Sequence, residues 1–339
     1  MASLSLRLAA TVVGFLMGGG VAHADDPPST GASAAASKAS ASEAASDGVA
    51  SVSEFPSGPA FTSGGLLDSG KLLLTGGVSN IEGAGGGGLA SWATITGYAT
   101  KDGIGANVHG TYVNTQRFGL TDYGVAVGLF NRVELSYARE EFNTRSVLTG
   151  LGFPNGFTLD QDIYGAKVRV LGDIVYDQDT LLPQIAVGVQ YKVDGTAPLQ
   201  SALLHAIGAR STSGTDFYIS ATKLFLAQNL LVDTTLRFTK GNQTGLLGFG
   251  GDLHDQYRPQ FEGSVAYLVT KHFAIGAEAR TKSSNLSFGG GLLREDNWYD
   301  VFAAYAVNKH LSVTLAYASL GQIVVKNQNG LYLSLQAGF

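Results

Sequence analysis

The stretch NGLYLSLQAGF, residues 329–339, ends the chain and alternates apolar with small or polar residues up to its last position. Side chains alternate between the two faces of a strand, so the apolar positions share one face. These positions are Leu331, Leu333, Leu335, Ala337 and Phe339. Terminal residues of soluble proteins are usually polar and untethered. The pattern therefore indicates an apolar phase beside the last strand, although a closing strand of a soluble β-sandwich remains the alternative.

The composition favours the first of these two interpretations. Charged residues make up 14% of the 339 residues, against roughly 25% in soluble proteins. After the first 24 residues, no run approaches the ~18 apolar residues of a membrane-spanning helix. Strands with one lipid-facing side produce low charge without long apolar runs. The absence of cysteine excludes disulfides and thiolate metal sites, and a net charge of −5 argues against a nucleic-acid partner.

The N-terminal part of the chain divides into two segments that precede the candidate domain. Residues 1–24 contain one early cation, Arg7, then an apolar run and the triplet Ala-His-Ala, which together predict a secretory signal peptide. Residues 25–65 are mostly alanine and serine and contain too little apolar surface to fold alone, which predicts a disordered periplasmic spacer. Residues 66–339 then form the single folded domain.

That domain alternates short and long connections between strands. Alternating runs occupy residues 133–140, 183–193, 261–269, 273–280, 300–307 and 311–318. Tight turns are expected at residues 131–132, 227–229, 270–272 and 308–310. Longer glycine-rich connections are expected at residues 143–158, 194–214, 241–257, 282–296 and 321–330. Outer-membrane barrels follow this rule, because their periplasmic turns are short and their external loops are long.

We therefore predict an all-β fold, a transmembrane antiparallel up-and-down β-barrel of about 14 strands in the bacterial outer membrane, with 12 to 16 possible. The first strand is expected at residues 70–78, followed by a hairpin loop at residues 83–88. An even strand number returns both termini to the periplasm. Aromatic residues fall at both predicted interfaces, as in aromatic girdles. They are Tyr112, Tyr123, Tyr137, Tyr191, Phe238, Phe261, Tyr299 and Tyr317 near one end, and Tyr267, Phe273, Tyr305 and Phe339 near the other.

Two stretches carry a resemblance to a known family: LLDSGKLLLTGGVSNIEG, residues 66–83, and residues 162–183. With them, the chain from about residue 66 resembles an uncharacterised proteobacterial family of outer-membrane barrels that is described only as a domain of unknown function. The resemblance implies the fold and the location and supplies no catalytic or binding residues. The terminal aromatic strand also resembles the recognition signal of outer-membrane barrels, which implies the barrel assembly machinery as a partner.

The inward faces of the strands are predicted to carry charges of both signs. The candidate lumen-lining residues are Glu134, Lys167, Arg169, Lys192, Asp233, Arg237, Glu262, Glu278, Arg280 and Asp300. Buried charges must be paired, so these side chains would either neutralise one another and fill the lumen or line a polar pore that selects solutes. A barrel of about 14 strands keeps an open lumen unless loops plug it.

Three long connections contain apolar glycine-rich runs that would be costly to leave in water. They are VLTGLGFPNGF at residues 147–157, TGLLGFGGDL at residues 244–253 and LSFGGGLL at residues 286–293. Two interpretations remain open, a self-packed cap or constriction and a capture site for hydrophobic compounds.

The sequence offers no convincing catalytic, metal or cofactor site. GAGGGG at residues 83–88 matches a phosphate-loop pattern only formally, because no helix is expected after it. His254 with Asp252 and Asp255 is a weak cation-binding pattern. His109 is predicted to face inward, but no nucleophile is paired with a base. We therefore expect no catalytic residue, no metal and no cofactor.

Three functions remain as hypotheses. The first is a passive pore for small solutes with a mixed-charge lumen, in contact with the lipid bilayer. The second is a transporter for hydrophobic compounds that uses the apolar external loops, and the third is a closed structural or enzymatic barrel.

Overall fold

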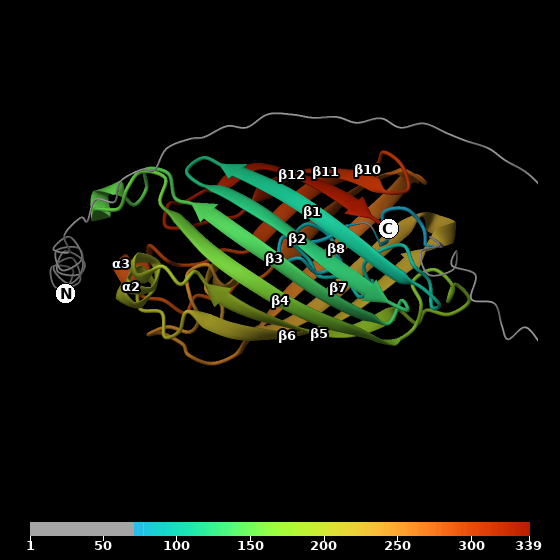
Figure 1. Ribbon diagram of the computed structural model, residues 1–339, viewed down its shortest axis with the longest axis horizontal. Coiled ribbons are helices and arrows are strands. Elements are labelled where there is room, and N and C mark those ends of the chain that lie inside the picture. Colours follow the sequence, from blue (N-terminus) through green and yellow to red (C-terminus); the bar gives the residue numbers. More distant parts are fainter. Residues whose placement is uncertain (1–70, 77) are drawn as a thin grey trace, which may run out of the picture.

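The computed structural model describes residues 71–76 and 78–339, and its strands form one closed antiparallel barrel (Figure 1). The strands are β1 Ile104–Thr115, β2 Gly119–Leu129, β3 Val133–Asn143, β4 Thr158–Leu171, β5 Gln184–Asp194, β6 Ser213–Phe225, β7 Leu230–Thr239, β8 Arg258–Thr270, β9 Phe273–Arg280, β10 Trp298–Ala306, β11 Leu311–Ser319 and β12 Asn329–Gly338. The helices are α2 Pro198–Ala206 and α3 Phe288–Gly291, and the 3-10 turns are η1 Thr149–Leu151, η2 Leu226–Gln228 and η3 Gln243–Gly245. The expected signal peptide, residues 1–24, and spacer, residues 25–65, lie outside the described residues.

Among the described residues, no helix has the length and apolar character needed to cross a membrane.

The last strand closes the barrel. β12 pairs with β11 on one side and with β1 on the other, in register from Asn107 opposite Gly338 to Thr115 opposite Gly330. The final residue continues this pairing, because the Phe339 N–H donates to the Ala106 carbonyl at 2.8 Å. Closure leaves no strand edge with unpaired backbone groups, which a barrel in hydrocarbon requires.

The connections differ between the two ends of the barrel. The turn end holds residues 130–132, 172–183, 226–229, 271–272 and 307–310 together with the C-terminus. The loop end holds residues 116–118, 144–157, 195–212, 240–257, 281–297 and 320–328. In Figure 1 the turn end lies at the right, beside the C-terminus, and the loop end lies at the left, beside α2 and α3. The tight turns and long connections expected from the sequence all occur, whereas residues 172–183 form a longer turn that was not anticipated.

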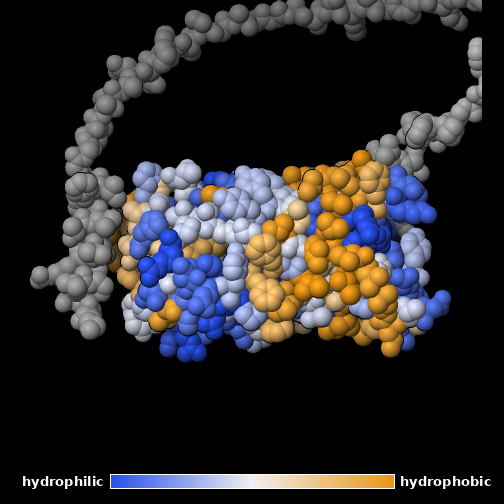
Figure 2. All heavy atoms as spheres, turned by 90° about the horizontal axis from the view of Figure 1, so that it is seen from below, coloured by the Kyte–Doolittle hydropathy of each residue, from blue (hydrophilic) through white to orange (hydrophobic). Residues whose placement is uncertain are grey.

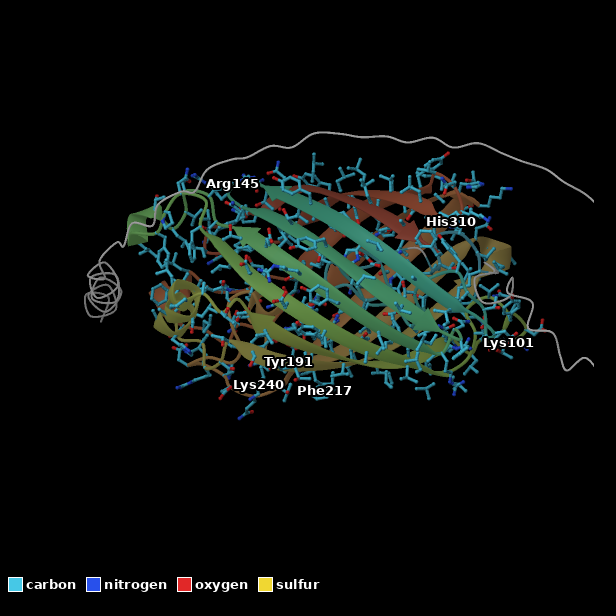
Figure 3. The ribbon with its side chains drawn as sticks, viewed as in Figure 1. Lys101, Arg145, Tyr191, Phe217, Lys240 and His310 are labelled. Atoms are coloured by element: carbon cyan, nitrogen blue, oxygen red, sulfur yellow. The ribbon has the colours of Figure 1, made fainter. Side chains whose placement is uncertain are left out.

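On the half nearer the turn end, the exterior of the barrel carries apolar side chains at alternating strand positions, whereas nearer the loop end the outward positions include charged residues such as Arg139 and Glu141. Val265 and Leu335 are about half exposed although they are aliphatic. On the face of the barrel that Figure 2 shows, hydrophobic residues are concentrated over the half nearer the turn end. Figure 3 places Tyr191 and Phe217 on the outer surface, with Lys101 and His310 at the turn end. An apolar belt on a closed barrel is the exterior of a membrane-spanning protein.

The barrel has twelve strands, not about fourteen, and the two missing strands are the first two that were expected. Residues 70–78 do not begin the barrel, and residues 83–88 are not a hairpin loop between spanning strands. Residues 78–99, which we call the lumen segment, instead lie buried inside the barrel. The glycine run at residues 83–88 has almost no side chains with which to cover lipid, and the backbone of the lumen segment bonds to inward side chains instead.

The interior is stratified along the barrel axis. At the loop end, a large apolar cluster joins inward side chains of the strands to the loops and reaches Ile81 of the lumen segment. At the turn end, a second apolar cluster packs around Trp92, Leu224 and Leu231. Buried charged side chains from the strand walls, among them Lys192 and Arg237, contact the lumen segment outside these two apolar clusters.

Leu335 lies on the lipid side of β12 and gives a direct test of this orientation. Replacing Leu335 with arginine should lower the free energy of unfolding by roughly 2–4 kcal/mol, because a cation is then held in hydrocarbon. The matched change Tyr317→Arg, nearer the loop end of β11, should cost only about 0–1 kcal/mol. Denaturant unfolding in lipid vesicles measures both costs, and equal costs would contradict the proposed depth.

Candidate functional site

The lumen segment is held by carboxylates of the barrel wall. Glu134 of β3 accepts hydrogen bonds from the backbone N–H groups of Gly85, at 3.0 Å, and Thr96, at 2.8 Å. Glu278 of β9 accepts from the Leu89 N–H at 2.7 Å. Buried backbone donors need partners, and here wall side chains supply what a neighbouring strand would otherwise provide.

Wall donors satisfy the carbonyl groups of the same segment. Lys167 of β4 donates to the carbonyls of Gly85, at 2.9 Å, and Trp92, at 3.1 Å. Gln184 of β5 donates to the Ala93 carbonyl at 2.5 Å. Because the backbone is bound so closely, a side chain at Gly87 would overlap Oε1 of Glu278. The glycine run is therefore suited to a narrow position against the wall.

Glu82 is the charged centre of the lumen segment. Its carboxylate is fully buried and lies 2.5 Å from Lys192 of β5 and 3.2 Å from Arg237 of β7. Arg280 of β9 binds both carboxylate oxygens, with Nη1 at 2.9 Å and Nη2 at 3.1 Å. This bidentate geometry is the strongest common arrangement for a guanidinium and a carboxylate. We call Lys192, Arg237 and Arg280 the basic cluster.

Two wall carboxylates share the basic cluster with Glu82. Asp216 of β6 lies 2.9 Å from Lys192, and Glu262 of β8 lies 2.5 Å from Arg237. Three cations and two wall anions leave one positive charge, which Glu82 neutralises. An uncompensated buried charge is strongly destabilising, so the lumen segment and the wall are electrostatically complementary.

Nine of the ten candidate lumen-lining residues are buried, and most contact the lumen segment or its ion pairs. Glu134 and Lys167 pair at 3.1 Å. Lys192, Arg237, Glu262 and Arg280 form or flank the basic cluster, and Glu278 binds the Leu89 N–H. Asp233 accepts a bond from Thr222 at 2.5 Å, and Asp300 lies opposite Glu278 in the register of β9 and β10.

Arg169 is the tenth residue and is only partly buried, because it lies near the turn end of β4. It pairs with Asp173 in the turn at 2.7 Å. Burial alone would raise the pKa of Asp173, but the N–H groups of Val175 and Tyr176 and the Arg169 guanidinium hold that pKa below its usual value. This arrangement fixes the turn of residues 172–183 and takes no part in binding Glu82.

Sequence reasoning missed Glu82 and Asp216. Glu82 is the sole charged residue between Lys71 and Lys101, and a lone carboxylate in so long an uncharged stretch is a signal that could have marked it. Asp216 lies at an inward position of β6, two residues before the buried Tyr218. Its strand begins beside a long connection, so the sequence does not show which face of the strand carries Asp216.

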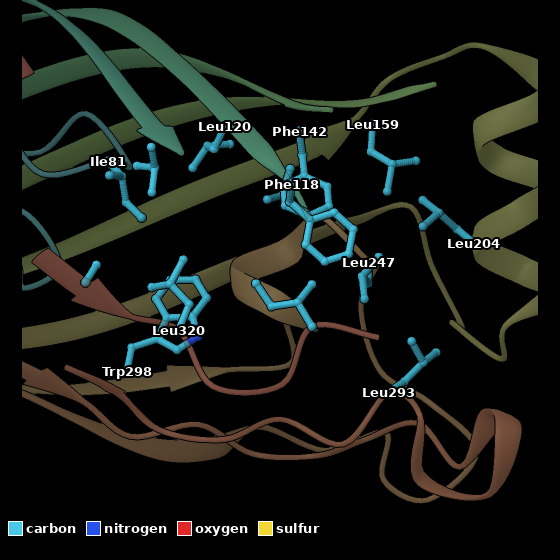
Figure 4. Packing of buried hydrophobic residues seen from close by; sticks show 14 of the residues in the cluster. Ile81, Phe118, Leu120, Phe142, Leu159, Leu204, Leu247, Leu293, Trp298 and Leu320 are labelled. Carbon is cyan, nitrogen blue, oxygen red and sulfur yellow. The ribbon is translucent and has the colours of Figure 1, made fainter. Parts of the chain in front are cut away.

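An apolar cavity of about 730 Å³ lies at the loop end. All three apolar loop runs line it, through Leu148 and Leu151, Leu247, and Phe288 with Leu293. Inward side chains of the strands complete its wall: Phe118, Phe142 and Leu159. Figure 4 shows Phe118, Phe142, Leu159, Leu247 and Leu293 gathered about the same space. The loops thus pack on one another and still leave room for a ligand.

The lining of this cavity is almost free of charge. Among the described residues that line it, Asp252 is the only ionisable one. Its carboxylate accepts a hydrogen bond from the Ser287 N–H at 2.9 Å. Burial alone would raise the pKa of Asp252, but the hydroxyl and N–H of Ser287 hold it below its usual value. An apolar lining with few polar groups is typical of a small-molecule site.

A tight turn at residues 242–248 joins the cavity to the basic cluster. Leu247 lines the cavity, and the Thr244 carbonyl accepts a hydrogen bond from Lys192 at 2.8 Å. Gln243 and Thr244 have φ values of 47° and 64°. A left-handed conformation is costly for a β-branched residue, and such strain often marks functional sites.

The other candidate sites, a histidine–carboxylate pair and a metal site, do not form a functional centre among the described residues. His109 Nε2 lies 3.0 Å from Asp122 in the barrel interior. Within residues 71–76 and 78–339, no group of three or more histidine, aspartate or glutamate side chains is placed to hold a metal ion.

Fold and interior together define a plugged membrane β-barrel with an apolar loop-end cavity. The sequence profile of the family described as "Protein of unknown function (DUF3034)" matches residues 75–336, and the chain belongs to this family. The matched region includes the lumen segment and the twelve strands, apart from the last residues of β12.

Comparison with other proteins adds little to this assignment. No curated protein matches the sequence. Among solved structures, the chain is similar to the KdgM porin, with a TM-score of 0.44, 11% identity, and coverage of 69% of this chain and 99% of that chain. The NanC porin has a TM-score of 0.44 and 10% identity, with coverage of 68% of this chain and 98% of that chain. Outer membrane phospholipase A from Escherichia coli has a TM-score of 0.37 and 10% identity, with coverage of 72% of this chain and 94% of that chain. These scores do not support transferring the functions of those proteins.

Gly128 of β2 allows the fit of the lumen segment to be tested. A side chain there would overlap the Thr96 carbonyl oxygen, so Gly128→Leu should displace the lumen segment and expose Trp92 to acrylamide. The reporter is Trp92 alone, in a Trp298→Phe background. The matched change Gly110→Leu has open space around it and should leave Trp92 protected. Equal protection in both variants would contradict the close fit.

Proposed function

We propose that the protein is a channel of the bacterial outer membrane that admits small hydrophobic compounds and is gated by its own lumen segment. The observation that carries the proposal is the apolar cavity of about 730 Å³ at the loop end. That volume is in the range of small-molecule sites, which are mostly apolar and few per protein. A hydrophobic solute gains free energy by leaving water for such a cavity.

Passage beyond the cavity requires movement of the lumen segment. Residues 78–99 are buried between the walls, and their backbone is bound by side chains of several strands. The channel is therefore closed at rest, and entry of a ligand must favour a rearranged state of the segment. The strained turn at residues 242–248 touches both the cavity and Lys192, and is placed to couple them.

The location in the outer membrane follows from the same proposal. The predicted signal peptide exports the chain, and the apolar belt and closed barrel suit a bilayer. The terminal aromatic strand supports insertion by the barrel assembly machinery. Both termini of the barrel would then face the periplasm, and the cavity would face the exterior.

Two other functions remain in competition. The charged inward side chains, such as Lys167 and Glu134, favour a passive pore for small solutes once the lumen segment has withdrawn. A steady conductance in planar bilayers would favour that pore over the hydrophobic channel. The filled lumen also agrees with a closed structural barrel, which leaves the cavity without an occupant.

A polar substitution in the cavity tests the proposed function. Leu203 of α2 is buried in the cavity wall. Leu203→Asp should weaken binding of 11-bromoundecan-1-ol at least about tenfold, because a carboxylate then lies in the apolar lining. Quenching of Trp298 by the bromine measures binding in lipid nanodiscs, with Trp92 replaced by phenylalanine.

The control for this experiment is Leu181→Asp. Leu181 is 85% exposed in the turn of residues 172–183 and lies at the opposite end of the barrel. This variant should bind the alcohol like the parent. Unchanged binding in Leu203→Asp, or no quenching in the parent, would contradict a hydrophobic site in this cavity.

A further inference from the structure

In the basic cluster, the three cations of the barrel wall outnumber the two wall carboxylates that pair with them by one charge. Lys192, Arg237 and Arg280 come from three different strands, and each is fully buried. The wall anions Asp216 and Glu262 balance two of these three cations. One positive charge remains, and a buried ion needs a partner.

Glu82 supplies that partner in the manner of a ligand. Glu82 belongs to no strand. Both of its carboxylate oxygens accept hydrogen bonds from the Arg280 guanidinium, and Lys192 binds one of these oxygens. The contacts come from the side chain, whereas the surrounding lumen segment is held mainly through its backbone. The basic cluster therefore recognises a carboxylate as such.

The basic cluster also lies below the apolar cavity. Leu159 of β4 lines the cavity, and Ile163, which lies opposite Lys192 in the register, is four residues further along that strand. At ~3.3 Å per residue the two levels are roughly 13 Å apart. The turn at residues 242–248 separates them and touches both, through Leu247 and the Thr244 carbonyl.

We propose that the channel takes amphipathic monocarboxylates, with the apolar part entering the loop-end cavity and the carboxylate replacing Glu82 at the basic cluster. Glu82 is then a tethered copy of the ligand's head group, and its displacement releases the lumen segment. This proposal rests on the proposed function, because it names the substrate class of the same cavity.

The charge balance selects a monoanion. A dianionic phosphate ester would leave the cluster with an excess negative charge beside Asp216 and Glu262, whereas a carboxylate restores neutrality. A neutral hydrophobic compound would fill the cavity but gain nothing at the cluster. The head group therefore determines whether the lumen segment is released.

The test compares two probes that differ only in the head group, 11-bromoundecanoic acid and 11-bromoundecan-1-ol. At about pH 8 the acid is fully ionised. The full chain in lipid nanodiscs carries Trp92→Phe, so that quenching of Trp298 reports entry. Glu82→Ala should tighten binding of the acid about tenfold, because the tethered competitor is gone, and should leave binding of the alcohol unchanged.

Two further variants assign this gain to the basic cluster. Glu140→Ala is the matched control, because Glu140 is also fully buried in the interior but is not in ion-pair contact with Lys192, Arg237 or Arg280 among the ion pairs of the described residues. Glu140→Ala should leave the binding of both the acid and the alcohol unchanged. Adding Arg280→Gln to Glu82→Ala should abolish the gain for the acid. A gain shared equally by acid and alcohol, or no gain at all, would overturn the proposal.

A second measurement separates this proposal from the proposed function. Acetate should raise the unfolding temperature of Glu82→Ala, because it can fill the vacant carboxylate position, and should not do so in the parent or in Glu140→Ala. If neither bromo-probe quenches Trp298, the hydrophobic channel fails while the acetate effect still supports the carboxylate site. If both probes bind and acetate has no selective effect, the carboxylate site fails alone.

Discussion

The ion pairs of Glu82 with Lys192, Arg237 and Arg280 are the interaction on which the interior depends. Three cations on a barrel wall would repel one another and destabilise a closed lumen unless anions meet them. Asp216 and Glu262 do so in part, and the lumen segment brings the remaining charge. A barrel of twelve strands can therefore bury many charged groups and remain filled.

The same interaction connects the two functional features of the molecule. The apolar cavity lies nearer the loop end than the basic cluster does, and the lumen segment fills the barrel around the basic cluster. A ligand with an apolar body and a carboxylate would satisfy both regions, and the free energy of its binding would offset the lost contacts of Glu82. Capture and opening then share one set of side chains, because Lys192 donates to the Thr244 carbonyl in the same turn that contributes Leu247 to the cavity lining.

The sequence predicts the barrel because the lipid phase imposes a period of two on every strand, from β3 to the terminal Phe339. The sequence also predicts the inward charges, because they alternate with the lipid-facing residues of each strand, and the apolar loops, because of their composition. The lumen segment was misassigned, because period two cannot distinguish a spanning strand from an extended segment inside a barrel. Glu82 was missed for that reason, since its partners come from strands more than a hundred residues away.

The central claim is that residues 78–99 occupy the lumen of the membrane-embedded barrel. Ser79 Oγ lies 3.0 Å from Asn107 Oδ1 of β1, and the chain has no cysteine of its own. In the double variant Ser79→Cys, Asn107→Cys, we expect a disulfide to form under mild oxidation in lipid. The pair Ser79→Cys, Val108→Cys should not form one, because Val108 faces outward. Free, readily alkylated thiols in the first pair would contradict the account.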